Sequence, residues 1–189
     1  MGHLIVAEQA REQLGLDKVL FMPAGQPWLK TDRAITEAHQ RLRMVELAVG
    51  GNRHFEASGL EVIRQGPSYS VDTLENLSLR QVEEIFLIVG MDVLEEFSRW
   101  HKLERVLEMA TVVAAPRPGV TTDPRTAMEK VKEGAGNQVH VLESPGIDVS
   151  SADIRSRLCK GLTVRYMLPD TVYEYIVSSK LYTRVDGRP

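Results

Sequence analysis

Two hydroxyl groups and one guanidinium group are clustered in residues 149–155. Ser150 and Ser151 come directly before a stretch that predicts a helix, and Arg155 follows one turn later. The free N–H groups and the macrodipole of a helix start attract anions, and hydroxyl and guanidinium groups donate to phosphate oxygens. The segment therefore predicts a phosphate site. The structural alternative is an ordinary capping box, with Ser150 as the cap and Asp153 as its partner.

Four other residues have side chains or positions suited to a nucleotide. Gly90 ends an apolar run, where a ligand can approach the backbone, and the Asp92 carboxylate can accept hydrogen bonds from ribose hydroxyls. Arg117 lies in a Pro-Arg-Pro-Gly turn after the next apolar run, and His3 precedes an amphipathic helical pattern where an imidazole can hold an anion. A surface turn and a frayed terminus are the structural alternatives for Arg117 and His3.

The hydrophobic pattern predicts a fold that can bring such residues together. Helical stretches alternate with short apolar or β-branched runs, which is typical of an α/β fold with a parallel sheet and helices on both faces. Ligands bind at the carboxyl ends of the strands in such folds. The predicted strands cover residues 18–23, 55–58, 60–63, 84–90, 111–115 and 138–142.

Capping residues and glycines delimit the predicted helices, which cover residues 36–49, 123–133 and 150–160 and a last stretch that begins at Pro169. The expected caps are Thr36, Asp123 and Ser150. We expect Val172, Ile176 and Val177 to dock the last helix and Cys159 to be a small buried hydrophobe. The prediction is a single domain, 1–189, with helical additions at its C-terminal end.

Composition excludes several classes of protein. The chain has 189 residues, 43% of them hydrophobic, and a chain of this size buries roughly 70% of its unfolded surface without staples. A net charge of -3 argues against a surface that coats nucleic acid, and no apolar run of about 18 residues predicts a membrane span. A single cysteine cannot form an internal disulfide. We therefore expect a cytoplasmic protein with a small-molecule partner, either monomeric or a homo-oligomer.

Taken together, these residues resemble the bacterial nicotinate mononucleotide adenylyltransferases, which belong to the nucleotidyltransferase superfamily with an HxGH signature. The resemblance extends over nearly the whole chain, with its landmarks in a shared order and spacing. These landmarks are residues 2–4, 21–27, 67–70, 72–74, 90–92, Phe97, Trp100, 117–119, 149–155 and the closing Leu181 and Tyr182.

The resemblance implies a Rossmann-like fold and transfer of AMP from ATP to nicotinate mononucleotide, giving deamido-NAD and pyrophosphate. The acceptor phosphate would attack the α-phosphorus in line, and the protein would act by positioning and charge stabilisation. His3 would be the catalytic donor. Mg²⁺ would arrive on the ATP phosphates, because the sequence has no carboxylate cluster with suitable spacing. The implied ATP-binding residues are Gly2, His3, Gly90, Asp92, Arg117, Ser150, Ser151 and Arg155.

On the acceptor side, the resemblance implies that Trp100 stacks on the pyridine ring. The backbone near His101 and the segment of Tyr69 and Ser70 would bind the nicotinate carboxylate. The usual Pro-Pro-His-Lys of the family is replaced here by residues 27–30, Pro-Trp-Leu-Lys, so Lys30 would supply the charge contact of that loop.

One departure from the family concerns the start of the chain. The family begins with a strand and a GxFDPxH loop, on the order of 10–15 residues, and neither precedes Gly2 here. We hypothesise that an internal methionine was taken as the start. The first histidine of HxGH would then be missing, and we expect little or no adenylyl transfer from the chain as given.

Two alternative functions stay open. A phosphopantetheine adenylyltransferase or a related enzyme belongs to the same superfamily, but residues 67–70 and 97–100 match the pyridine-side pattern better. A non-catalytic nucleotide-binding remnant is the alternative from a different class. Product identity separates the first from the leading hypothesis, and calorimetry separates the second.

Overall fold

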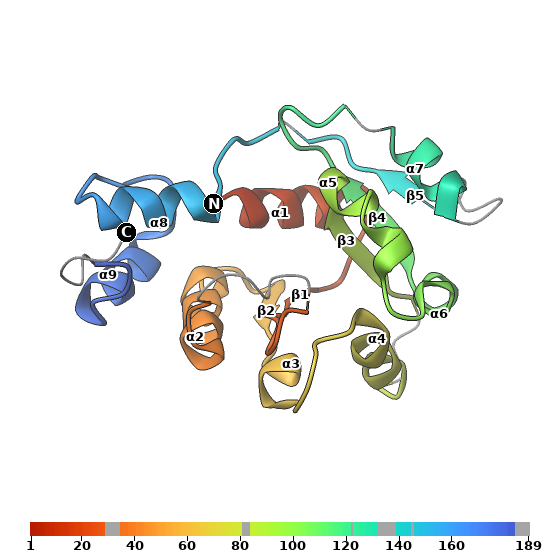
Figure 1. Cartoon of the computed structure of the whole chain (residues 1–189), viewed down its shortest axis with the longest axis horizontal. Coiled ribbons are helices and arrows are strands. Elements are labelled where there is room, and N and C mark those ends of the chain that lie inside the picture. The colour runs from red at the N-terminus through yellow and green to blue at the C-terminus, as the bar shows by residue number, and fades with distance from the viewer. Residues whose placement is uncertain (29–34, 81–83, 122, 132–138, 145, 184–189) are drawn as a thin grey trace.

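The computed structural model describes the whole chain except residues 29–34, 81–83, 122, 132–138, 145 and 184–189. Helices and strands alternate along it, which confirms the α/β prediction (Figure 1). The strands are β1 (Val19–Phe21), β2 (Phe55–Ala57), β3 (Phe86–Gly90), β4 (Thr111–Ala115) and β5 (Val139–Val141). The helices are α1 (Gly2–Leu14), α2 (Ala38–Val49), α3 (Leu60–Ile63), α4 (Ser70–Ser78), α5 (Met91–Leu94), the 3-10 helix η1 (Phe97–Arg99), α6 (Leu103–Met109), α7 (Pro124–Val131), α8 (Ser151–Cys159) and α9 (Asp170–Ser178).

The described strands form two parallel sheets rather than one continuous sheet. β1 pairs with β2, and β3, β4 and β5 pair in that order. In the second sheet, Gly90 lies opposite Ala115, so β3 and β4 end at the same level. The loops that follow these two strands are therefore neighbours at the carboxyl edge of the sheet, where ligands bind in such folds.

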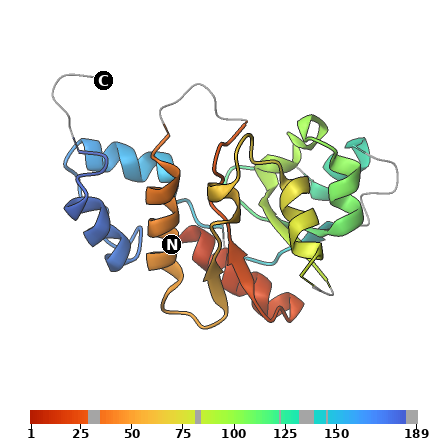
Figure 2. The same cartoon turned by 90° about the horizontal axis from the view of Figure 1, so that it is seen from below.

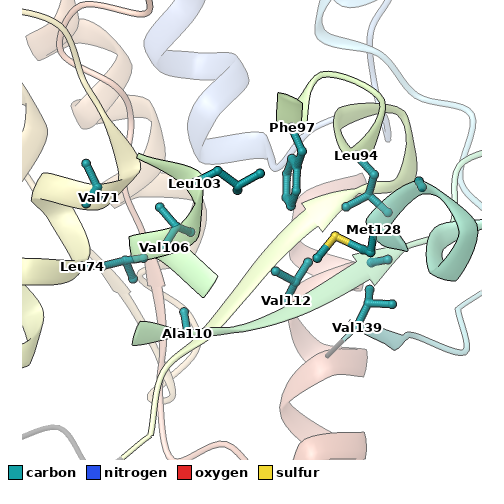
Figure 3. Packing of buried hydrophobic residues seen from close by; sticks show 12 residues of the cluster. Val71, Leu74, Leu94, Phe97, Leu103, Val106, Ala110, Val112, Met128 and Val139 are labelled. Carbon is teal, nitrogen blue, oxygen red and sulfur yellow. The ribbon is translucent and has the colours of Figure 1, made fainter. Parts of the chain in front are cut away.

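Helices cover both faces of the larger sheet, as predicted. Along β4, Val112 and Ala114 face one cluster of buried residues, and Val113 and Ala115 face another. The first cluster joins the sheet to α4, α5, α6 and α7, and Figure 3 shows its side chains gathered around Val112. The second joins the sheet to α1. This arrangement explains why successive residues of β4 are apolar.

The C-terminal helices form a third hydrophobic cluster, with α9 packed against α2 (Figure 2). Val172 and Ile176 are buried there, as expected. Two predictions in this region are wrong: Val177 is 53% exposed, and Cys159 is exposed. Both residues lie on the solvent side of their helices, because only one stripe of each helix faces the cluster.

The prediction of a strand over residues 60–63 is also wrong. These residues form the one-turn helix α3, which is closed by hydrogen bonds from the N–H groups of Val62 and Ile63 to the carbonyl of Gly59. Ile63 is 81% exposed. A short apolar run does not by itself separate a strand from a helical turn, and here local hydrogen bonds decide the outcome.

Thr36 does not cap α2, contrary to the prediction. The helix begins at Ala38 after Glu37, and the Thr36 hydroxyl forms a 2.8 Å hydrogen bond with the hydroxyl of Tyr182. A partner distant in the sequence has therefore taken the place of the local cap.

Asp123 caps α7, as predicted. Its carboxylate accepts hydrogen bonds from the backbone N–H of Thr126, at 3.1 Å, and from the Thr126 hydroxyl. These hydrogen bonds, the hydroxyl contact first, hold the pKa of Asp123 below its ordinary value of 3.8. The carboxylate therefore stabilises the folded state while it is ionised.

Asp123→Ala is expected to lower the melting temperature by about 2–4 °C at neutral pH, because the cap of α7 is lost. The difference from the parent protein should persist down to pH 3.8 and disappear as the pH falls through the lower pKa of the folded state. Thermal melts followed by circular dichroism at a series of pH values measure this. Asp17→Ala, at an exposed aspartate outside the helices, is the control and should leave the melting temperature unchanged. A pH-independent difference for Asp123→Ala would contradict the cap as its source.

Candidate functional site

The starts of α1 and α8 lie next to each other. The segment that enters α8 passes beside Gly2, where an added Cβ would lie 3.9 Å from the carbonyl oxygen of Val149. Figure 1 shows the marked N-terminus beside the first turn of α8. Both helices direct free N–H groups and the positive end of their dipoles toward this region, so it is suited to an anion.

The side chains at this double helix start are largely available to a ligand. Ser150 accepts a 3.0 Å hydrogen bond from the N–H of Asp153, so its predicted role as the cap is confirmed, but its O–H can still donate to a phosphate oxygen. Ser151 and Arg155 are exposed, and neither side chain has a hydrogen bond or ion pair with any described residue. His3 is exposed in the first turn of α1, inside the helix rather than ahead of it.

A second group lies at the carboxyl ends of β3 and β4. Arg117 donates to Asp92 with an N–O distance of 2.5 Å, joining the two neighbouring loops. Both side chains are partly exposed, so the pair contributes little to stability but fixes the direction of each group. A Cβ at Gly90 would lie 2.4 Å from the Asp92 carboxylate, so only glycine leaves room for this carboxylate where it stands.

A third group consists of aromatic rings from three loops. The rings of Tyr69 and His101 are stacked with centroids 4.4 Å apart, and the Trp28 ring lies 5.8 Å from Tyr69. Trp100 instead packs on the buried Phe97, at 4.6 Å. The indole N–H of Trp100 is buried without a hydrogen-bond partner among the described residues. The open aromatic surface is therefore formed chiefly by Tyr69 and His101.

A network of polar residues, in which Thr73 is buried and Arg64 and Glu61 are partly buried, supports Tyr69. Arg64 donates to the carbonyl of Tyr69 at 3.3 Å and to the hydroxyl of Thr73 at 3.2 Å. The Thr73 hydroxyl donates to Glu61 at 2.7 Å. Thr73 is 7% exposed, so this network is largely shielded from water. The family resemblance marks Thr73 within residues 72–74, but nothing in the sequence pattern marks Glu61 or Arg64, because the three side chains meet only when α3 and α4 pack together.

The structure thus gathers the predicted site residues into three groups. Figure 1 shows α1 running from the α8 side of the molecule toward the β3–β4–β5 sheet, which carries the second group. Ser70 begins α4, directly after Tyr69 of the third group. Lys30 lies outside the described residues. The three groups lie on different elements of the described chain, so a ligand that used all of them would have to bridge them.

Two other kinds of feature are absent from the described residues. No group of three or more histidine, cysteine, aspartate and glutamate side chains there is arranged to hold a metal ion. None of the helices described here has the length and apolar character needed to cross a membrane.

The family of cytidylyltransferase-like proteins matches residues 1–157 of the chain. The α/β fold, the adjacent helix starts and the ion pair at the strand ends are consistent with this match, and the chain is a cytidylyltransferase-like protein. Solved structures of Plasmodium falciparum nicotinic acid mononucleotide adenylyltransferase share the fold. The complexes with APC and with NaAD each give a TM-score of 0.74, at 15% and 16% identity, and cover 96% of this chain and 90% of that chain.

Sequence relatives give a narrower family. A protein of Dehalococcoides mccartyi is 39% identical over 185 residues, which is 97% of this chain and 91% of the relative. A protein of Thermomicrobium roseum is 41% identical over 187 residues, which is 98% of this chain and 87% of the relative. Both carry the name "probable nicotinate-nucleotide adenylyltransferase". The chain therefore belongs to the nicotinate-nucleotide adenylyltransferase family.

Proposed function

We propose that this protein transfers the adenylyl group of ATP to nicotinate mononucleotide, giving deamido-NAD and pyrophosphate in NAD biosynthesis. The observation that carries the proposal is 39% identity to a relative of that name over 97% of the chain. The adjacent helix starts, with an exposed Arg155 guanidinium that has no partner among the described residues, support it independently as a place for a polyphosphate.

On the ATP side, the triphosphate would lie at the starts of α1 and α8. Ser150, Ser151 and Arg155 would donate to the β- and γ-phosphates, and His3 would donate to oxygens around the α-phosphorus. The Asp92 carboxylate would accept from a ribose hydroxyl near the backbone of Gly90, with Arg117 held beside it at 2.5 Å. These residues would place hydrogen-bond donors at the negative phosphates of the nucleotide and a hydrogen-bond acceptor, Asp92, at its ribose hydroxyls.

The reaction needs no protein nucleophile. An oxygen of the acceptor phosphate forms a bond to the α-phosphorus while the bond from that phosphorus to the bridging β-phosphate oxygen breaks, and pyrophosphate leaves with the electron pair. The α1 and α8 starts would stabilise the negative charge on both the reacting centre and the leaving group, so catalysis comes from positioning and electrostatics. Mg²⁺ would enter bound to the ATP phosphates, where it neutralises charge.

On the acceptor side, the aromatic group would bind the pyridine ring, with Trp100 or the Tyr69–His101 pair as the stacking surface. The free N–H groups at the start of α4, beside Ser70, and the backbone at His101 would donate to the nicotinate carboxylate. Lys30 would supply a charge contact to the acceptor. ATP and the mononucleotide are intracellular metabolites, so the proposal places the protein in the cytoplasm.

The test is an acceptor panel. The protein is incubated with ATP, Mg²⁺ and either nicotinate mononucleotide, its amide or phosphopantetheine, at protein concentrations high enough to detect slow turnover. Pyrophosphate release gives the rate, and mass spectrometry identifies the product. We expect deamido-NAD from nicotinate mononucleotide at the highest rate. Dephospho-coenzyme A as the main product would favour the phosphopantetheine alternative, and calorimetric nucleotide binding without any product would favour a non-catalytic remnant.

A further inference from the structure

Arg41, on the first turn of α2, joins two points that are eleven residues apart in the chain, counted from Gly25 to Thr36. Its guanidinium donates from Nε to the carbonyl of Thr36 at 2.9 Å and from a terminal nitrogen to the carbonyl of Gly25 at 3.0 Å. A planar guanidinium can make both hydrogen bonds at once, whereas a lysine ammonium cannot span the two carbonyls in the same way. Arg41 therefore holds together the two described ends of this stretch.

The surroundings of Arg41 suit a structural role. We call the pair of hydrogen bonds from Arg41 to the carbonyls of Gly25 and Thr36 the clasp. The guanidinium is partly buried, and burial lowers its pKa from the ordinary arginine value without removing its charge at neutral pH. A groove of about 430 Å³ lies alongside, lined by residues including Gln26, Pro27, Thr36 and Arg64. Because both hydrogen bonds go to backbone carbonyls, they fix the course of the chain rather than one rotamer of a neighbour.

The backbone that Arg41 holds at Gly25 leads directly into the aromatic group. Gln26 and Ser68 exchange two hydrogen bonds, from the Gln26 N–H to the Ser68 hydroxyl at 3.2 Å and from the Ser68 N–H to the Gln26 carbonyl at 2.9 Å. Two residues further on, the Trp28 ring contacts Tyr69. At the other side, a Cβ at Gly25 would lie 2.1 Å from the carbonyl oxygen of Glu61, so the segment is fitted closely against α3.

Tyr182 secures the other end of the stretch. Its hydroxyl is hydrogen-bonded to the hydroxyl of Thr36, and its backbone has a φ of 59°. Residues other than glycine seldom adopt this left-handed conformation unless their surroundings hold them there. The C-terminal hydrophobic cluster also packs against Leu181 and Tyr182. This packing holds Tyr182 in place, so its hydroxyl is a fixed partner for Thr36.

We propose that Arg41 is a positioning residue of the acceptor subsite. Together with Tyr182, it clasps residues 25 and 36 and so holds Trp28 against Tyr69, whose ring stacks on His101. The identity of the acceptor rests on the proposed function, but the clasp does not. Its loss displaces the wall of the acceptor subsite and leaves the α8 phosphate-binding residues in place.

Fluorescence tests the clasp without catalysis. Trp28 and Trp100 are the two tryptophans of the chain, so a Trp100→Phe background leaves Trp28 as the single reporter. In this background, Arg41→Lys and Arg41→Ala are expected to shift the emission of Trp28 to the red and to increase its quenching by acrylamide at least twofold. Arg43→Ala is the matched control, because Arg43 lies on the same helix, is exposed and pairs with Glu46. It should change neither quantity.

Kinetics with the native tryptophans tests the consequence for the acceptor. Arg41→Lys is expected to raise the KM for nicotinate mononucleotide about tenfold while the KM for ATP changes less than twofold, because only the acceptor wall moves. Tyr182→Phe removes only the hydroxyl that holds Thr36 and should raise the same KM by about two- to threefold. Tyr173→Phe, at a tyrosine 42% exposed on α9, is its control.

The outcomes separate the clasp from the proposed function. Unchanged Trp28 fluorescence in both Arg41 variants would overturn the clasp, as would equal rises in both KM values. A melting temperature that falls while the acceptor KM stays constant would reduce Arg41 to a purely structural role and overturn the proposal. If the parent protein adenylates another acceptor in place of nicotinate mononucleotide, the proposed function fails, and the fluorescence shift still decides whether the clasp exists.

Discussion

Arg155→Ala should lower kcat/KM for ATP by about 100- to 1,000-fold, which is the range observed when one preorganised donor to a developing charge is removed. Arg155 is exposed one turn into α8, beside the Ser150 cap and the start of α1, and its guanidinium makes no hydrogen bond or ion pair with the described residues. A cation without a partner among the described residues, at a helix start suited to an anion, is available to bind phosphate. Steady-state pyrophosphate release measures the effect on catalysis, and calorimetry measures the effect on ATP binding.

Two further variants make the Arg155 result specific. Arg155→Lys keeps the charge but loses the two-pronged geometry, so it should recover only part of the ATP affinity. Lys160→Ala removes a cation just beyond the other end of α8 and should leave both measurements within twofold of the parent protein. Because Arg155 has no partner among the described residues, its replacement should leave the melting temperature nearly unchanged. ATP binding by Arg155→Ala equal to that of the parent would show that the triphosphate does not lie at α8.

The elements that the sequence predicts well are those fixed by local pattern. Residues 111–115 are all apolar or β-branched, and β4 occupies the same five residues, because a strand buried on both faces needs no polar side. Ser150 caps α8 as its hydroxyl and position indicate. The pattern gives the wrong structure for residues 60–63, where short-range hydrogen bonds form a helical turn, and for Thr36, whose hydroxyl is bonded to the distant Tyr182.

In the candidate site, the sequence likewise identifies individual residues but not the contacts that they make with distant parts of the chain. Sequence alone marks Asp92 and Arg117 as nucleotide-binding candidates, but their mutual ion pair follows from the register of β3 and β4, which no local pattern specifies. It also marks Trp100 but cannot foresee that this ring packs on Phe97 while Tyr69 stacks on His101. Such contacts depend on how separate loops meet, and single-sequence periodicity carries no information about that.

The Gly90→Ala variant should separate activity from stability at the carboxyl ends of β3 and β4. Gly90 has a φ of -69° and a ψ of 149°, which any residue adopts without strain, so the backbone tolerates alanine. The new Cβ would instead lie 2.4 Å from the Asp92 carboxylate, which must rotate away and leave Arg117. Since a flexible side-chain end yields easily, we expect the melting temperature to change by less than about 2 °C. The kcat/KM for ATP should fall by about 100-fold, because the carboxylate that we propose accepts from the ribose is displaced.

A double-mutant cycle shows whether Gly90 acts through Asp92. If displacement of the carboxylate is the whole effect, Gly90→Ala combined with Asp92→Ala should be no worse than Asp92→Ala alone. Additive losses would mean that the Cβ blocks the nucleotide directly, and the assignment of Asp92 to the ribose would lose its support. Gly51→Ala is the control, because a Cβ there meets nothing within 4 Å, and it should leave both turnover and melting temperature near those of the parent protein. An unchanged Gly90→Ala enzyme would remove the second group from the active site altogether.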